Sequence, residues 1–254
     1  MARPIDYDQL LASGYGHTAR VGYLSPGIID ETLSGQWYRM APLGVTLVRT
    51  SLELKDVTVD EVNSAVERTE RAATELGKYK PDCIVFGGSP TVAVAGFGFE
   101  KTIVELIERT SGCKAFSAQA VAIKALQKYG AKKIAVATPF PDNVNALVKV
   151  FLEKAGLEVL SIVGSGVNYL HLTTTPLQVS WDVGKRAFEE AKNADALYFA
   201  GAPTPCVDIL EPLERELNTL AVSSLQCSLW NALNITGYKK SIDGYGRLLR
   251  DIGT

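Results

Sequence analysis

Residues 82–91 read Asp-Cys-Ile-Val-Phe-Gly-Gly-Ser-Pro-Thr, and residues 195–204 read Asp-Ala-Leu-Tyr-Phe-Ala-Gly-Ala-Pro-Thr. The two stretches are 195 − 82 = 113 residues apart, and five of their ten positions are identical. Each copy is a short apolar run, typical of a buried strand, that ends in a Gly-x-Pro-Thr turn. The duplication predicts two equivalent α/β halves, each of which presents a strand-end turn to a shared cleft.

The composition is that of an ordinary soluble globular protein. The chain has 254 residues, of which 46% are hydrophobic and 21% charged, and its formal net charge is −2. No strongly basic segment indicates a nucleic-acid partner, and no run of 18 apolar residues indicates a membrane span. The N-terminal residues lack a hydrophobic signal core, which favours a cytoplasmic location. The length allows one large domain or two of about 125 residues.

The residue types that hold metals and nucleotides are scarce. The four cysteines have no CxxC spacing and are interpreted as free thiols. With two histidines and no ligand cluster, a catalytic metal is not expected. Gly96-Phe-Gly98 lacks the third glycine of a dinucleotide fingerprint, and no phosphate-binding Gly-x-x-x-x-Gly-Lys motif occurs. The sequence therefore predicts a site that works without a cofactor.

Strand-like and helix-like segments alternate along the whole chain, which predicts a parallel-sheet α/β fold. Strands are expected at 21–24, 45–49, 83–86, 133–137, 159–163, 196–199 and 220–222. The alternation breaks at Ser111-Gly-Cys-Lys114. The expected division is a first half of residues 1–115 together with 220–254, and a second half of residues 116–219.

The two turns have the features of a carboxylate site. Ligands of open parallel sheets bind beyond the carboxyl ends of the strands, and small residues there let a ligand approach the backbone. Exposed amides at such turns favour a carboxylate or a developing oxyanion. The expected donors are Gly88, Ser89, Thr91, Gly201, Ala202 and Thr204. The alternative is that the two threonines are only helix N-caps, but the duplication favours binding.

Four stretches carry a family resemblance: Ser25-Pro26, the two turns, Thr138-x-Phe140-x-Asp142-x-Val144-Asn145, and Gly244-Tyr-Gly-Arg-Leu248. In their order and spacing the chain resembles the aspartate/glutamate racemase superfamily, in its arylmalonate decarboxylase and maleate isomerase branch. The resemblance covers nearly the whole length. It implies two pseudo-symmetric, Rossmann-like parallel-sheet halves with the site in the cleft between them.

The resemblance also implies cofactor-free chemistry, with a cysteine as acid or base at the end of each repeat strand. By repeat position those sites are Gly88 and Gly201. Glycine at the first is what the decarboxylase branch shows, but that branch keeps the second cysteine as proton donor, and this chain lacks it. Phe140 stands where the family usually offers a tyrosine hydroxyl to the carboxylate. Pro26 and Asn168 complete the expected substrate-binding residues.

The decarboxylase branch presses an apolar pocket against the departing carboxylate, which destabilises its charge. The matching positions here are all aliphatic: Leu54, Val57, Val62, Val167 and Leu170. Ordinary core packing is the alternative explanation for these five residues.

Two residues are candidate proton carriers. Cys206 lies five residues beyond Gly201 at an expected helix start, where the pKa of a thiol can fall. The alternative for Cys206 is a small buried residue. His171 lies in a segment that the family uses to line its pocket, and histidine suits proton transfer near neutral pH. An ordinary surface or core histidine is the alternative there.

Together these features favour an enzyme, a cofactor-independent lyase of the decarboxylase type. Its substrate would be a small carboxylate or dicarboxylate, converted through an enolate-like intermediate held by the turns. Racemisation by two bases, or isomerisation through a thiol adduct, is disfavoured because both expected cysteine positions are glycine.

Two alternatives stay open: a protein that binds a carboxylate without turnover, and an isomerase, hydratase or hydrolase that uses His171 or a relocated thiol. No nucleic-acid or membrane partner is expected, and a homo-oligomer is compatible with this class of protein.

Overall fold

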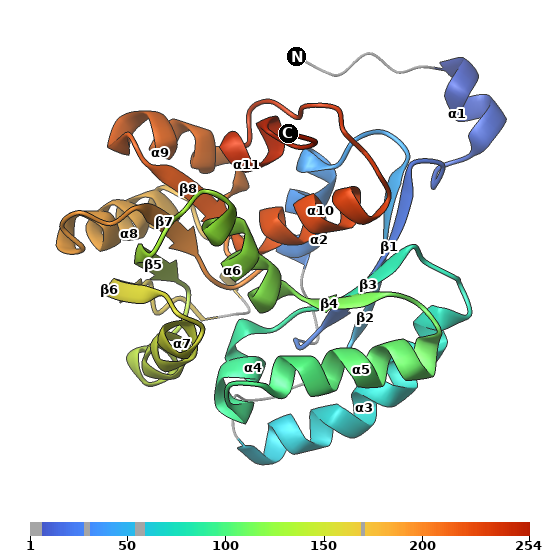
Figure 1. The fold of residues 1–254 in the computed structure, drawn as a ribbon, viewed down its shortest axis with the longest axis horizontal. Coiled ribbons are helices and arrows are strands. Elements are labelled where there is room, and N and C mark those ends of the chain that lie inside the picture. The colour runs from blue at the N-terminus through green and yellow to red at the C-terminus, as the bar shows by residue number, and fades with distance from the viewer. Residues whose placement is uncertain (1–6, 28–30, 54–58, 169–170) are drawn as a thin grey trace.

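The computed structural model describes residues 7–27, 31–53, 59–168 and 171–254. In this part of the chain the strands form two four-stranded parallel sheets (Figure 1). The first sheet has the spatial order β2 (Val45–Ser51), β1 (Ala19–Ser25), β3 (Cys83–Phe86) and β4 (Ala115–Ser117). The second sheet has the order β6 (Glu158–Gly164), β5 (Lys133–Thr138), β7 (Ala196–Phe199) and β8 (Leu220–Ser223).

The two sheets repeat each other residue by residue. Leu24 on β1 lies opposite Phe86 on β3, and Ala137 on β5 lies opposite Phe199 on β7. Leu24 and Ala137 are 137 − 24 = 113 residues apart, the same spacing as the two sequence copies. The repeat therefore extends to the strand that precedes each copy, and the predicted α/β fold with two equivalent halves is confirmed.

The repeated aspartates hold the start of each central strand. Asp82 Oδ2 accepts a hydrogen bond from Arg20 N at 2.7 Å, and Asp195 Oδ2 accepts from Lys132 N and Lys133 N at 2.9 and 2.8 Å. The amide of each aspartate donates back to the strand, to Arg20 O and Lys133 O. The backbone bonds lower the pKa of Asp195. Both copies of the repeat have an aspartate at this position because it makes equivalent hydrogen bonds in the two sheets.

Helices cover both sheets. In the first half, α3 (Val59–Gly77) packs against α5 (Phe99–Ser111), and in the second half α7 (Asp142–Lys154) and α8 (Leu177–Glu190) pack on β6. Gly77 ends α3 at a close approach, because a Cβ there would lie 2.5 Å from Ser111 O. Further helices in the described residues are α1 (Tyr7–Ser13), α2 (Glu31–Met40), α4 (Ser89–Ala95), the short 3₁₀ helix η2 (Val207–Ile209), α9 (Leu210–Leu217) and α11 (Arg247–Arg250).

Two helices cross between the sheets and pack against each other, as the centre of Figure 1 shows. α6 (Ala118–Lys128) leaves β4 and reaches β8, whereas α10 (Ser224–Ile235) leaves β8 and packs on β1 and β3. Ser223 begins α10 with a capping box closed by Gln226. Since β8 pairs with β7, residues 220–223 lie in the second sheet and not with the first half, where the sequence placed them.

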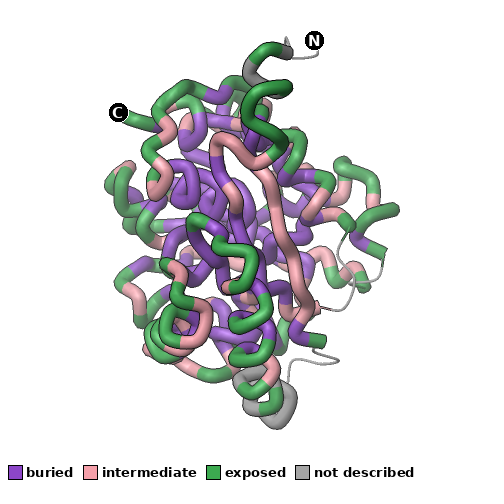
Figure 2. The backbone as a smooth tube through the Cα atoms, turned by 90° about the vertical axis from the view of Figure 1, so that its right-hand side faces the viewer, coloured by how far each residue is buried: buried purple, intermediate pink, exposed green. Residues whose placement is uncertain are grey.

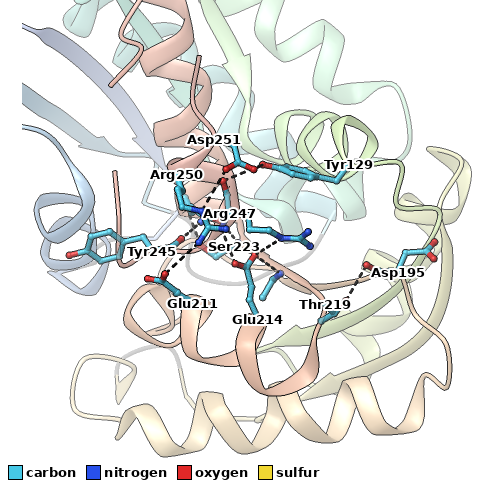
Figure 3. A network of polar contacts seen from close by, with 12 residues as sticks. Tyr129, Asp195, Glu211, Glu214, Thr219, Ser223, Tyr245, Arg247, Arg250 and Asp251 are labelled. Carbon is cyan, nitrogen blue, oxygen red and sulfur yellow. Dashed lines mark hydrogen bonds and ion pairs between the residues drawn. The ribbon is translucent and has the colours of Figure 1, made fainter. Parts of the chain in front are cut away.

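The C-terminal segment is held by a polar network around Glu214 (Figure 3). The Glu214 carboxylate accepts hydrogen bonds from Ala221 N at 3.1 Å and from Arg247 N at 2.8 Å. Burial nevertheless raises the pKa of Glu214. Farther out, Arg250 pairs with Glu211 at 3.6 Å. The network joins α9, β8 and α11.

The strands of both sheets supply most of the core. β3, β7 and β8 are buried at every position, and Figure 2 shows buried backbone in the interior beneath exposed outer turns. Such continuous burial is typical of parallel strands covered on both faces. Within the described residues, no helix combines the length and the apolar character needed to cross a membrane.

Candidate functional site

The first turn is built around Gly88, at the end of β3. Gly88 has a φ of 105°, and a Cβ at this position would lie 2.4 Å from Pro26 Cγ and 3.0 Å from Thr91 Oγ1. Glycine alone adopts this conformation without steric cost. Ser89 and Thr91 follow in the first turn of α4, and both are buried. Four of the predicted binding residues are therefore gathered at one strand end.

The second turn has the same construction around Gly201, whose φ is 97°. A Cβ there would lie 3.0 Å from Phe140 Cζ, 3.2 Å from Pro139 Cδ and 3.3 Å from Thr204 Oγ1. Pro139 lies 139 − 26 = 113 residues after Pro26, so each left-handed glycine is flanked by an equivalent proline and an equivalent threonine. The Phe140 ring rests against the position at which the resemblance places a cysteine.

The segment that carries Phe140 is fixed by Asn145. The Thr138 hydroxyl donates to Asn145 Oδ1 at 2.6 Å and accepts from Phe140 N at 3.1 Å. The Asn145 amide donates to Phe140 O at 3.3 Å. Asn145 is buried, and its contacts hold the local backbone in place.

The two turns differ in which amides are available. Gly201 N donates to Ser224 Oγ at 3.3 Å, and Thr204 N donates to Gly201 O at 3.0 Å. The expectation that the Gly201 and Thr204 amides await a ligand is therefore wrong, because the protein itself supplies their acceptors. Within the described part of the chain, the amides of Gly88, Ser89 and Ala202 have no hydrogen-bond partner. Each turn therefore keeps at least one backbone amide that can donate a hydrogen bond to a ligand.

The alternative that the two threonines are N-caps is wrong. Gly88 is the N-cap of α4, which places Thr91 inside the helix. Cys206 precedes η2 as its N-cap, and the Thr204 hydroxyl donates to Ala200 O at 3.3 Å. The threonines are instead packed beside the two left-handed glycines.

The Cys206 thiol does not have the lowered pKa that its position suggested. Its side chain is 1% exposed, and burial raises the pKa of the thiol to about 12. The opposing influence is a hydrogen bond with Ser223, at the end of β8. The Cys206 amide donates to Gln36 Oε1 at 2.8 Å, so the local backbone is held by α2. The effect of burial on the pKa of the thiol is therefore larger than the effect of the helix start.

The loop after β6 holds the other candidate proton carrier. His171 and Asn168 are exposed, and His171 N donates to Asn168 O at 2.9 Å. Val167 is half-buried. Within the described residues, no hydrogen bond or ion pair joins the His171 ring to either turn. Leu54, Val57 and Leu170, together with the side chain of Val62, lie outside the described residues.

A pocket opens beside the second turn. It is lined by residues of the second half only, among them Thr138, Pro139, Ser165, Leu172 and Thr204. Its lining includes both hydroxyl and apolar side chains. No group of three or more His, Cys, Asp or Glu side chains in the described residues is arranged to hold a metal ion.

The sequence reasoning missed a buried polar cluster behind the turns, formed by Tyr198, Ser224 and Gln119. Tyr198 Oη lies 2.7 Å from Ser224 Oγ and donates to Gln119 Oε1 at 3.3 Å. A signal was present in the repeat itself. Tyr198 is a polar residue in an apolar strand, and its counterpart 113 residues earlier is Val85.

The comparisons with known proteins concern the family and the fold. A family model described as arylmalonate decarboxylase matches residues 38–249. Arylmalonate decarboxylase from Bordetella bronchiseptica is 24% identical over 208 residues, which cover 79% of this chain and 85% of that protein. A solved variant of arylmalonate decarboxylase in a liganded form, 22% identical, superposes with a TM-score of 0.82 over 91% of this chain and 99% of that one.

A second branch is represented among the solved structures by Nocardia farcinica maleate cis-trans isomerase. A cysteine-to-serine variant of that protein, with a covalently bound succinylcysteine intermediate, is 19% identical and has a TM-score of 0.79. The superposition covers 91% of this chain and 98% of that one. At this identity the likeness concerns the fold. Because the family model spans most of the sequence, the chain belongs to the arylmalonate decarboxylase family.

Proposed function

We propose that this protein is a cofactor-independent decarboxylase of a small malonate-like dicarboxylate. The observation that carries the proposal is the pair of equivalent turns, each with a left-handed glycine and at least one amide without a partner among the described residues. Unpartnered amides at a strand end are a favourable environment for carboxylate oxygens and for the oxyanion of an enolate. By their names, the arylmalonate decarboxylase and maleate isomerase relatives act on dicarboxylates.

The reaction follows from the charge that such a site stabilises. The bond between the central carbon and one carboxyl group breaks, carbon dioxide leaves, and the electron pair remains as an enolate of the other carboxylate. The amides of Gly88 and Ser89 at one turn and of Ala202 at the other would hold the carboxylate oxygens while charge develops on them. One proton then adds to the carbon and gives the monocarboxylate.

Decarboxylation suits this chain better than racemisation or isomerisation. A two-base racemase needs an acid or base on each face of the substrate, and a thiol-adduct isomerase needs a nucleophile. Gly88 and Gly201 provide neither. Loss of carbon dioxide requires no base, because the leaving group takes no proton with it.

The proton for the enolate would come from a water molecule at the turns. The Cys206 thiol is buried against Ser223, and the His171 ring is exposed without a described contact to the turns. Solvent water is the donor that we propose in place of these two side chains.

The test is a panel of aryl- and alkylmalonates and maleate, followed for carbon dioxide release and for thermal stabilisation. We expect carbon dioxide from at least one malonate, and we expect Cys206→Ala and His171→Ala to keep turnover within about threefold, since neither side chain is placed on the reacting atoms. A loss of a hundredfold or more in one variant would identify that residue as the proton donor and refute the water route.

The second candidate function is carboxylate binding without turnover. The absence of both turn cysteines, the raised pKa of Cys206 and the exposure of His171 favour it. Under this alternative, malonates raise the melting temperature but no product forms at any pH. The same panel therefore separates the two functions.

A further inference from the structure

The chain that leaves the second turn departs from the repeat at Pro205. In the first half, Val92 N donates to Gly88 O at 3.1 Å and closes the first turn of α4. The residue 205 − 92 = 113 positions later is Pro205, which has no amide hydrogen. The bond that closes α4 is therefore not available at the second turn, where the chain continues into the short helix η2 instead.

This departure leaves two buried amides to be satisfied, those of Cys206 and Val207. Their counterparts in the first half, Ala93 and Val94, lie inside α4. Cys206 and Val207 are 1% and 0% exposed, and the Cys206 side chain makes no capping hydrogen bond at the start of η2. Because a buried amide without an acceptor is destabilising, the fold needs an acceptor from another part of the chain.

The acceptor is Gln36, on α2 in the first half. Gln36 Oε1 accepts hydrogen bonds from Cys206 N at 2.8 Å and from Val207 N at 3.1 Å. One carbonyl oxygen has two lone pairs and satisfies both amides. Gln36 is 6% exposed, and its Nε2 has no hydrogen-bond partner within the described residues. The two backbone donors therefore fix the orientation of the side-chain amide.

Gln36 is the buried member of a polar face that α2 turns toward the second half. Thr32, Gln36 and Arg39 are four and three residues apart, so they lie on one side of the helix. Thr32 Oγ1 lies 2.5 Å from Thr173 Oγ1, and Arg39 pairs with Asp208 at 2.7 Å. These two contacts are reached by water, whereas those of Gln36 are not.

We propose that Gln36 is a positioning residue, which caps η2 from the opposite half and holds the segment leaving the second turn against α2. In the chain, α2 follows β1 and Pro26, whose ring packs against Gly88 at the first turn. The consequence for ligands rests on the proposed function, in which both turns contact one dicarboxylate. The cap itself exists with or without a ligand.

The substitution that tests the cap is Gln36→Met, which keeps the length of the side chain and removes the acceptor. Amide hydrogen exchange of Cys206 and Val207 reports on the cap, and exchange of Val136, buried on β5, reports on global stability. We expect the first two amides to accelerate roughly three- to tenfold more than Val136, as for one lost hydrogen bond each. Equal acceleration at all three amides would overturn the cap.

Two further variants separate the acceptor from the docking of the helix. Gln36→Glu keeps an acceptor oxygen and is expected to retain the protection of both amides. Thr32→Ala removes the contact with Thr173 on the same face of α2, and we expect the exchange of Cys206 and Val207 relative to Val136 to stay as in the wild type. Acceleration in Thr32→Ala equal to that in Gln36→Met would assign the protection to α2 as a whole and overturn the role of Gln36.

Binding of a malonate tests the positioning role. We expect the dissociation constant of phenylmalonate to rise roughly three- to tenfold in Gln36→Met. The control is Tyr129→Phe, which removes a hydroxyl that bonds Arg247 O and Asp251 in the C-terminal network, and its affinity should be unchanged. Accelerated exchange in Gln36→Met with an unchanged affinity would refute the positioning role and leave a cap that only stabilises the fold.

Failure of the proposed function would look different. If the wild type neither binds nor converts any malonate or maleate, carboxylate chemistry at the turns is wrong. The exchange of Cys206 and Val207 still decides whether Gln36 caps η2.

Discussion

At the scale of the residue, the glycines of the two turns are under unequal steric demands. A Cβ at Gly88 would lie 2.4 Å from Pro26 Cγ, in a ring closed onto the backbone nitrogen, whereas at Gly201 the nearest atom is 3.0 Å away at the far end of the Phe140 ring. Both positions have left-handed φ values, which cost a non-glycine residue about 1–2 kcal/mol. The clash at Gly88 adds to this cost.

We therefore expect Gly88→Ala to lower the free energy of unfolding by roughly 2–4 kcal/mol and Gly201→Ala by roughly 1–2 kcal/mol. Urea denaturation of the two variants beside the wild type measures the difference. Equal losses, or a larger loss at Gly201, would show that Pro26 moves more easily than its position indicates.

The buried thiols make the folded protein less stable at alkaline pH. Burial raises the pKa of Cys83 and of Cys206 to about 12, while a thiol in the unfolded chain ionises near its ordinary value. The folded pKa is the higher one, so the stabilisation is complete below the unfolded pKa and is lost as pH rises toward the folded pKa. Each such thiol makes the free energy of unfolding fall by about 1.4 kcal/mol per pH unit in that window.

Cys206→Ala should remove one of these contributions. We expect the slope of unfolding free energy against pH, between about pH 9 and 11, to become less negative by about 1.4 kcal/mol per unit. The slope is the readout because the cavity left by the substitution shifts stability equally at every pH. An unchanged slope would mean that the Cys206 thiol ionises in the folded protein.

At the scale of the element, the C-terminal segment depends on one carboxylate. Glu214 accepts two backbone amides, from Ala221 and Arg247, and its side chain is buried. Glu214→Ala leaves both amides without an acceptor, and we expect a loss of about 2–4 kcal/mol in the free energy of unfolding. The control is Glu211→Ala, which breaks a partly exposed ion pair with Arg250 and should cost less than about 1 kcal/mol. Similar losses would contradict the anchoring role.

Strands were easier to predict from the sequence than short helices. Each of the seven expected strands is present, because short apolar runs bounded by turn residues identify buried parallel strands. α4 was missed since it contains Pro90, which is tolerated in the first turn of a helix. β4 has only three residues and carries too little pattern to be recognised.

The candidate site could be located from the sequence, but its chemistry could not be assigned. The turn glycines and their neighbours are local features. The acceptor of Gly201 N is Ser224, on another helix, and the raised pKa of Cys206 follows from packing around it. Both are tertiary effects, and a local pattern such as a helix start does not reveal them.

At the scale of the whole molecule, α2 connects the two halves. Gln36 Oε1 accepts hydrogen bonds from Cys206 N and Val207 N at 2.8 and 3.1 Å, and Arg39 pairs with Asp208 at 2.7 Å. The loop that follows the second turn is thereby attached to a helix of the first half. Such an arrangement suits a ligand that contacts both turns at once.

The measurement that tests the central claim most directly is the fate of phenylmalonate in D₂O, with the wild-type protein treated with a chelator beforehand. We expect one carbon dioxide per phenylmalonate consumed, and one deuteron on the α-carbon of the phenylacetate formed. Such a result shows that the enolate carbon takes its proton from solvent, or from a group that exchanges with solvent, without a metal. Thermal stabilisation by phenylmalonate with no carbon dioxide released would contradict the claim and leave a carboxylate-binding protein.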